Sequence, residues 1–316
     1  MRRFLISRLL QLIPVLLVGS IGVWGLAYLL PGNPAVAFLG PDASATQLAA
    51  EEKMLGLDRP LPLQYVLWLG RAVQGNFGIS DISRLPVTTL MGPAAVASLQ
   101  LAVFAFVIAL LSGIPLGVWA AQAGDRFAAT LVSWYSSLTL GVPTFWLGIL
   151  LILLFGVATH VLPTSSQYIP VWDDPADCLR ALLLPALTLG LYMSGIIARF
   201  VRGAMDTELH SEYVQLADAK GISRSRIVWK HALRNAMLPT VTIVGLQFGT
   251  FIGGAVVTEA VFNYPGMGTL ILNALLQRDY PTLQGAILVV IAAFVVVNLL
   301  VDVVYAVLDP RIKFAS

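Results

Sequence analysis

Long uninterrupted runs of apolar residues constrain this chain more than any other feature of its sequence. The first run covers residues 9–30, and five more follow at about residues 94–121, 132–157, 181–201, 237–261 and 282–308. Each reaches the roughly 20 residues that an α-helix needs to cross the hydrocarbon core of a bilayer. Because backbone polar groups in lipid must be satisfied within the segment itself, the runs predict an all-α membrane protein with six transmembrane helices.

Composition supports this class and disfavours several others. Of 316 residues, 58% are hydrophobic and 11% are charged, against about 25% charged in an average soluble domain. A net charge of +2 is too small to indicate a nucleic-acid partner. The single cysteine, Cys178, allows no disulfide within the chain and no cysteine-rich metal site. With no HExxH pattern and no GxxxxGK[ST] loop, we predict no metal site and no nucleotide hydrolysis by this chain, which is therefore not an enzyme.

The distribution of lysine and arginine predicts the orientation in the membrane. With the N-terminus inside, 13 basic residues fall on the cytoplasmic side and six on the outer side. Cytoplasmic loops carry the excess of basic residues, so both termini are expected in the cytoplasm. Residues 1–93 would form the first membrane helix and an extracytoplasmic region, and residues 94–316 a core of five membrane helices.

The cytoplasmic segment 207–239 is long for a connector and predicts a helix, a glycine turn and a second helix. Ser211 and Ser223 are expected to cap the two helices, and Gly221 to end the first in a left-handed conformation. The first helix carries side chains that would form a low apolar ridge: Val214, Leu216, Ala217 and Ala219. Such a ridge suits insertion into the cleft of another protein. An amphipathic helix lying on lipid headgroups is the alternative.

This segment resembles the EAA-type coupling loop of ABC importer permeases. Only Ala217 and Gly221 match the general EAA pattern. The form found in dipeptide, oligopeptide and nickel permeases matches at more positions: Tyr213, Val214, Ala217, Ala219, Lys220, Gly221, residues 231–235, Leu238 and Pro239. Further stretches of the same resemblance include LLPGNP at 29–34, TEAVFNYPGMG at 258–268 and NLLVDVVYAVLDPR at 298–311. The insert at residues 31–93 is similar to the B-type subunit of this family.

The resemblance implies a type I ABC importer permease fold in the bacterial cytoplasmic (inner) membrane. The chain would be one permease subunit of an ATP-driven importer of dipeptides, oligopeptides or similar small solutes. Its implied partners are a homologous C-type permease, two ATPase subunits that bind ATP and Mg²⁺, an extracytoplasmic solute-binding protein and membrane lipid; the chain itself would hold no cofactor. The residues implied in coupling to the ATPases are Glu212, Tyr213, Val214, Leu216, Ala217, Asp218, Ala219 and Gly221.

Two further sets of residues are candidates for function. Gly245, Gly249 and Gly253 form a small-residue face, flanked by the polar Gln247 and Thr250. This face would pack within the subunit or line the translocation path at the subunit interface, as the resemblance implies; the polar pair would meet substrate or bond between helices.

The second set is an outer turn, expected to expose aromatics for docking of the binding protein or to be an ordinary interfacial turn. Its residues are Glu259, Phe262, Tyr264, Pro265 and Gly266.

One alternative function is an ion-coupled secondary transporter of small solutes. Such a carrier would also be polytopic, but internal repeats and charged residues at the membrane midplane are not evident. The exact substrate is not determined by the motifs, since dipeptide, oligopeptide, nickel-chelate, glutathione-like and opine importers share them.

Overall fold

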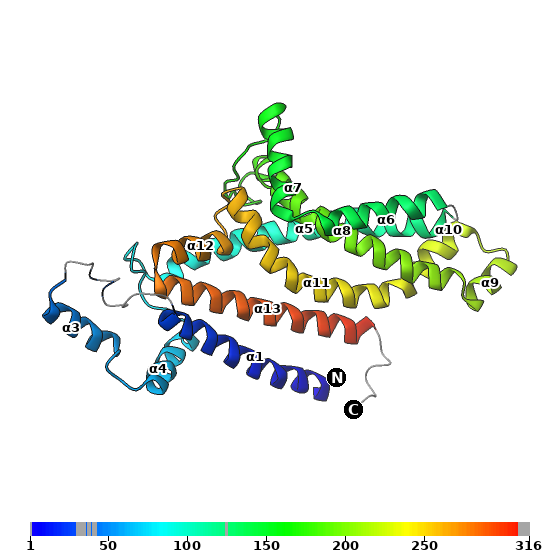
Figure 1. The fold of residues 1–316 in the computed structure, drawn as a ribbon. Helices are drawn as coiled ribbons and strands as arrows, with labels where there is room; N and C mark the ends of the chain where they lie inside the picture. Colours follow the sequence, from blue (N-terminus) through cyan, green and yellow to red (C-terminus); the bar gives the residue numbers. More distant parts are fainter. Residues whose placement is uncertain (1, 30–35, 37–38, 40–42, 124–125, 309–316) are drawn as a thin grey trace. The chain divides into compact units, whose positions relative to one another are not determined.

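The computed structural model describes residues 2–29, 36, 39, 43–123 and 126–308, and most of these residues are helical (Figure 1). The six apolar runs all form helices: α1 (Arg2–Leu29), α5 (Val87–Gln122), α6 (Arg126–Gly141) followed by α7 (Thr144–Leu151) and the π-helical η1 (Ile152–Ala158), α8 (Pro175–Leu209), α11 (Leu233–Val261) and α13 (Tyr280–Leu308). Shorter elements lie between them: α3 (Ala45–Leu55), α4 (Leu61–Val73), α9 (Glu212–Ala219), α10 (Arg224–Arg226), the π-helical η2 (Ile227–Ala232) and α12 (Met267–Gln277). The all-α prediction is confirmed for the described residues.

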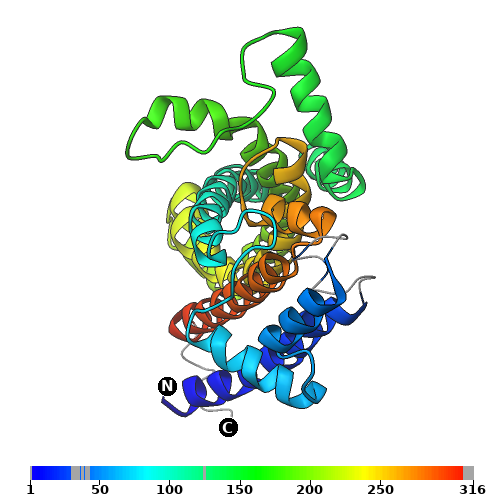
Figure 2. The same cartoon turned by 90° about the vertical axis from the view of Figure 1, so that its left-hand side faces the viewer.

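Among these residues, α5, α8 and α13 are each long and apolar enough to cross a membrane. The α6–α7 pair passes the same test if it is counted as one span, but it is bent by 100°. The bend lies next to Pro143, which precedes α7 and cannot continue a helical hydrogen-bond ladder. Figures 1 and 2 show α7 turning away from α6. Six crossings therefore remain a prediction, whereas the break at Pro143 agrees with the sequence.

The chain divides into two compact units, described separately here. Unit 1 comprises residues 1–4, 99–264 and 297–316, and unit 2 comprises residues 5–98 and 265–296. In unit 2, α1 and α13 run antiparallel. Gly19 of α1 lies against Ile291 of α13. Further along α1 the contact moves back toward the start of α13, where Gln284 Nε2 donates to the Trp24 carbonyl at 3.1 Å. α4 is held to α1 by the hydroxyls of Ser20 and Tyr65, 2.8 Å apart.

The connection between α4 and α5 in unit 2 is tied to the start of α13 by one carboxylate. Asp279 is 4% exposed and accepts hydrogen bonds from Ser80 Oγ at 2.5 Å and from the Asp81 amide at 3.1 Å. Apolar side chains pack beside it into a small core: Val87, Met91, Ala94, Met267 and Ala286. Unit 2 is thus held together by contacts between segments nearly 200 residues apart in the sequence.

Unit 1 is built around α8, of which 78% of the most apolar stretch is buried. α5 approaches it closely along a stripe of small residues spaced four apart: Ala105, Ala109, Gly113 and Gly117. A Cβ at Gly113 would lie 2.8 Å from the Ser194 carbonyl oxygen, and one at Gly117 would lie 2.7 Å from that of Ala198. Small residues at this spacing let two helix backbones meet. The sequence analysis did not single out this stripe, although the period of four was visible.

Candidate functional site

The segment predicted to couple to an ATPase folds as a short helix with a glycine stop. α9 covers Glu212–Ala219, and Gly221 has φ 73°, in the left-handed region. The Gly221 amide donates to the Asp218 carbonyl at 2.9 Å and the Ile222 amide donates to the Ala217 carbonyl at 3.1 Å. These two bonds form a Schellman motif, the common way in which glycine ends a helix. The predicted sequence of helix, glycine turn and helix is confirmed.

The side-chain caps predicted at the two serines are wrong. Ser211 occupies the N-cap position of α9 and Ser223 that of α10, but neither side chain accepts a capping hydrogen bond. The Ser211 hydroxyl instead donates to the Glu208 carbonyl at 2.6 Å. It therefore satisfies an orphan carbonyl at the end of α8 and leaves the first amides of α9 without this cap.

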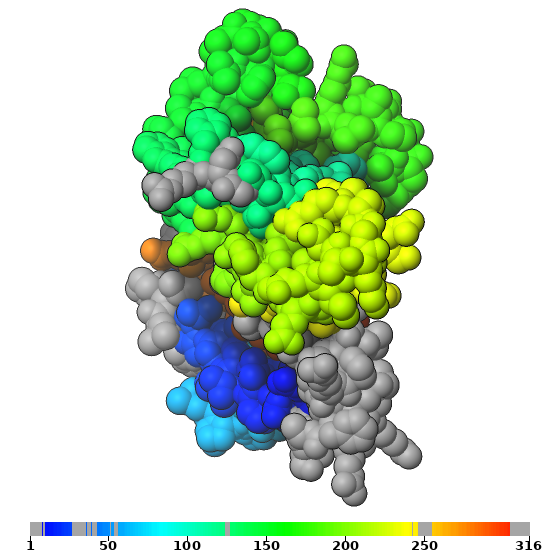
Figure 3. All heavy atoms as spheres, turned by 90° about the vertical axis from the view of Figure 1, so that its right-hand side faces the viewer, coloured from blue at the N-terminus to red at the C-terminus, as the bar shows by residue number. Residues whose placement is uncertain are grey.

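The face that α9 presents differs in part from the predicted ridge. Leu216 is 57% exposed and Tyr213 is 37% exposed, and Ala217 is half-buried between the exposed neighbours of the helix. Val214, by contrast, is 2% exposed and lies on the side where α9 packs against η2. Val214 therefore anchors the helix, and the accessible ridge is formed by Tyr213, Leu216 and Ala219. Figure 3 looks onto the yellow-green segments of this region, which form a convex surface.

A polar cluster that the sequence analysis missed fixes α9 in place. The Glu208 carboxylate, on the last turn of α8, accepts a hydrogen bond from the Tyr213 hydroxyl at 2.6 Å and one from Asn235 Nδ2 at 3.4 Å. Burial, followed by the hydrogen bond to Glu208, raises the pKa of Tyr213 above its ordinary value. The phenol therefore stays protonated at physiological pH and acts as the donor.

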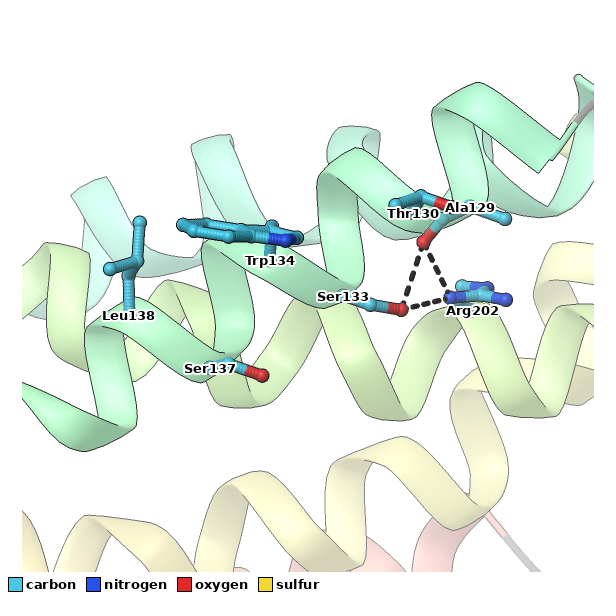
Figure 4. A pocket seen from close by; sticks show the side chains of 7 residues that line it. All are labelled: Ala129, Thr130, Ser133, Trp134, Ser137, Leu138 and Arg202. Carbon is cyan, nitrogen blue, oxygen red and sulfur yellow. Dashed lines mark hydrogen bonds between the residues drawn. The ribbon is translucent and has the colours of Figure 1, made fainter.

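A groove of about 570 Å³ lies on unit 1 where α6 crosses α8 (Figure 4). Arg202 of α8 closes one end, with Nη1 donating to the Ala129 carbonyl at 2.8 Å and to Ser133 Oγ at 2.7 Å. The lining combines hydroxyls with apolar side chains: Ala129, Thr130, Ser133, Trp134, Ser137, Leu138 and Arg202. Gly245, the described member of the set predicted for the translocation path, does not contribute to it.

The predicted small-residue face on α11 is described at one position. A Cβ at Gly245 would overlap the side chain of Val301 on α13, which belongs to the same unit. At Gly245 the structure thus favours packing within the subunit over an interface with another chain. Gln247, Gly249, Thr250 and Gly253 lie within the helix, but their side chains fall outside the described residues.

The outer turn does not expose its aromatic residues, so that prediction is wrong. Phe262 and Tyr264 are both fully buried, and Glu259 is 1% exposed. Phe262 lies against Gly148 of α7, and its carbonyl accepts a hydrogen bond from the Ser166 amide at 2.8 Å. The Phe262 ring fits against α7 because Gly148 has no side chain.

What remains of the outer turn as an accessible surface is small. Gly266 is buried as well, and of the five predicted docking residues only Pro265 is exposed, next to the exposed Asn263. The two aromatics therefore serve the core of unit 1 in this structure.

Comparison with known proteins identifies the family. Residues 113–314 match the family described as binding-protein-dependent transport system inner membrane component, and residues 1–88 match the N-terminal membrane component of the same systems. The chain belongs to this family. It is 39% identical to the glutathione transport system permease protein GsiC of Escherichia coli (strain K12) over 314 residues, which are 99% of this chain and 100% of that protein. GsiC of Salmonella typhimurium (strain LT2) is 38% identical over the same length.

A solved structure agrees on the fold. A chain of the inward-facing MetNI methionine ABC transporter superposes with a TM-score of 0.53 at 16% identity, covering 67% of the permease and 93% of that chain. This supports the predicted permease fold. The family and the relatives confirm the resemblance to ABC importer permeases of the dipeptide, oligopeptide and nickel group, and place the permease in the inner membrane as a multi-pass subunit. The related proteins are permease subunits, not enzymes.

Proposed function

We propose that the permease translocates short peptides of the glutathione type, driven by ATPase subunits that act on it through α9. The observation that carries the coupling role is α9 itself: a short helix with an exposed ridge, ended by a Schellman motif and anchored by Val214. A helix of this kind suits insertion into a cleft on a partner protein. The substrate class rests on full-length relatives that bear the name of a glutathione transport system.

The proposed assembly follows from the family. A homologous C-type permease would complete the path, two ATPase subunits would bind ATP and Mg²⁺ in the cytoplasm, and a solute-binding protein would deliver substrate outside. Closure of the ATPases would displace α9, and the displacement would tilt the membrane helices between inward-open and outward-open states. The chain would supply shape change and path, without chemistry of its own.

The test places a large charged side chain on α9 at Ala217, which is half-buried. Ala217→Arg is expected to lower co-purification of the ATPases, peptide uptake and substrate-stimulated hydrolysis in proteoliposomes, because overpacking a tight contact costs about 1–3 kcal/mol. Gly203→Arg is the matched control, since a Cβ there meets nothing within 4 Å and the position lies on α8. If all three quantities keep their wild-type values in Ala217→Arg, α9 is not the coupling element.

Two further measurements test the orientation in the membrane and separate this proposal from a secondary transporter. In a Cys178→Ser background, Ser83→Cys should react with an impermeant thiol reagent from outside and Ser225→Cys should not; both positions are exposed. Uptake of labelled glutathione or a dipeptide should require the ATPases and ATP. Uptake by this chain alone in an ion gradient would contradict the importer.

A further inference from the structure

Three elements of unit 1 meet on one residue at the end of α8. The Glu208 side chain accepts hydrogen bonds from Tyr213 on α9, at 2.6 Å, and from Asn235 on α11, at 3.4 Å. The Glu208 carbonyl accepts two more, from the Ser211 hydroxyl at 2.6 Å and from the Ser211 amide at 3.2 Å. Glu208 lies on α8, and its side chain thus connects this helix to the coupling helix α9 and to α11.

These contacts differ in kind from the others that hold α9. Val214 packs by apolar contact against η2, and such packing has no preferred direction, so the helix could rock about it. The bond from Tyr213 to Glu208 is directional, and bonds to an ionised carboxylate are shorter and about twice as strong as neutral ones. Glu208 itself is half-buried, and its two side-chain hydrogen bonds lie at the exposed surface.

Tyr213 has two roles in this geometry. Its ring is 37% exposed on the accessible ridge of α9, and its hydroxyl is bound to Glu208. A partner that presses on the ridge would therefore press on a side chain whose far end is tied to α8 and, through the same carboxylate oxygen, to Asn235 of α11.

We infer that Glu208 is the positioning residue that transmits a displacement of α9 to α8 and α11 together. The inference rests on the proposed coupling role of α9 and adds the connection by which that role would reach the membrane helices. Without the carboxylate, α9 would still dock and still be anchored by Val214, but no side-chain bond would connect Tyr213 to α8 and, through the same oxygen, to α11. Uptake would then lag behind ATP hydrolysis.

The experiment measures peptide taken up per ATP hydrolysed in proteoliposomes that contain the full transporter. Tyr213→Phe keeps the ring and removes the donor, whereas Glu208→Gln keeps the shape and removes the charge. Tyr213→Phe is expected to lower the ratio roughly tenfold, the size of effect that the loss of one hydrogen bond to a charged group produces. Glu208→Gln is expected to lower it less, because the amide oxygen still accepts from Tyr213. Assembly and the KM for ATP should stay at wild-type values in Glu208→Gln, because this change lies on α8 and leaves the ridge of α9 intact.

Tyr135→Phe is the matched control. It also removes a tyrosine hydroxyl that bonds between two helices of unit 1, here from α6 to Ser194 of α8, but it does not touch α9. The ratio should be unchanged in this control. The double variant Glu208→Gln with Tyr213→Phe should be no worse than Tyr213→Phe alone, because Tyr213→Phe already removes the bond that Glu208→Gln weakens.

The outcomes separate this inference from the proposed function. If Ala217→Arg uncouples the transporter while Tyr213→Phe and Glu208→Gln keep a wild-type ratio, α9 couples but Glu208 does not transmit, and the inference is overturned. Additive effects of the two changes on uptake per ATP in the double variant would also overturn the inference. So would a fall in the thermal stability of the single variants with an unchanged ratio of uptake to ATP hydrolysis. If Ala217→Arg has no effect either, the coupling role fails and the inference falls with it.

Discussion

Unit 1 contains two pairs of glutamate and tyrosine with the same spacing and opposite surroundings. Glu208 and Tyr213 lie at the end of α8, and Glu259 and Tyr264 lie at the end of α11, five residues apart in each case. Tyr213 is 37% exposed with its hydroxyl on the Glu208 carboxylate, whereas Tyr264 is fully buried. The same residue types at the same interval therefore form a surface clamp in one place and part of a core in the other.

The backbone between the two residues explains the difference. After α11, Asn263 adopts φ 50°, and the Tyr264 amide donates to the Glu259 carbonyl at 2.8 Å, which folds the chain back over the last turn. After α8, no residue from Glu208 to Tyr213 has a positive φ, and α9 starts at once. A left-handed residue directs the next side chain onto the helix it has just ended, so Tyr264 turns inward and Tyr213 stays at the surface.

The largest effect that this comparison predicts is on stability. Tyr264→Ala should lower the free energy of unfolding by about 3–5 kcal/mol, as removal of a fully buried ring usually does. Tyr213→Ala should cost about 1 kcal/mol, since it loses one hydrogen bond and little buried area. Thermal unfolding of the purified transporter measures both, with Tyr264→Phe as the control that keeps the ring. Equal losses for the two alanine variants would show that the exposure difference has no energetic weight.

The next largest effect is expected at Gly221, the residue with positive φ at which α9 ends. Gly221→Val should cost about 1–2 kcal/mol in backbone strain, because an L-residue with a branched Cβ is disfavoured at φ 73°. Space is not the cause, since a Cβ at Gly221 meets nothing within 4 Å. Uptake should fall while membrane insertion persists. Gly203→Val, at an equally open helical position, should leave uptake unchanged; a similar loss there would point to bulk and not to conformation.

The sequence predicted a structural feature correctly where that feature is determined by the residue itself and its neighbours in the chain. The stop at Gly221 was predicted because a positive φ is a property of the residue and its neighbours. The apolar runs predicted the helices for a similar reason, since their lengths are set by the bilayer. The exposure of Phe262 and Tyr264 was predicted wrongly, because it depends on Gly148 and Ser166, which lie about 100 residues away.

The same distinction applies to the coupling site. Leu216 and Ala219 lie on the accessible face of α9 as the predicted ridge required, whereas Ala217 is half-buried and Val214 is buried on the helix that packs against η2. The bond between Glu208 and Asn235 was not predicted, since nothing in the sequence pairs two polar residues 27 positions apart. Gly113 and Gly117 were missed in favour of the stripe at Gly245, although both stripes repeat every four residues; only the position of α8 distinguishes them.

A smaller effect is expected in alkaline solution. Burial raises the pKa of both Tyr213 and Tyr264 above the ordinary value of 10.0. Their contribution to stability is complete below pH 10 and is lost as the pH rises toward the folded-state pKa, because the unfolded chain then releases protons that the folded chain retains. Each such tyrosine steepens the loss by at most about 1.4 kcal/mol per pH unit. Thermal unfolding midpoints between pH 9 and 11 should therefore fall less steeply with pH in Tyr264→Phe than in wild type. Tyr213→Phe should change this pH slope less than Tyr264→Phe does. Equal slopes in all three proteins would contradict the difference in burial between the two tyrosines.

The smallest effect comes from exchanging the two left-handed residues themselves. Asparagine tolerates positive φ better than other non-glycine residues, so Gly221→Asn and Asn263→Gly should each preserve the turn. Asparagine loses less conformational entropy on folding than glycine but pays a little at φ 73°, and the two terms nearly cancel to within about 0.5 kcal/mol. Thermal unfolding and uptake should both match wild type in each variant. A loss of uptake in Gly221→Asn alone, with stability unchanged, would mean that Gly221 must lack a side chain in order to contact a partner. The turns at Gly221 and Asn263 would then share a backbone conformation but differ in function.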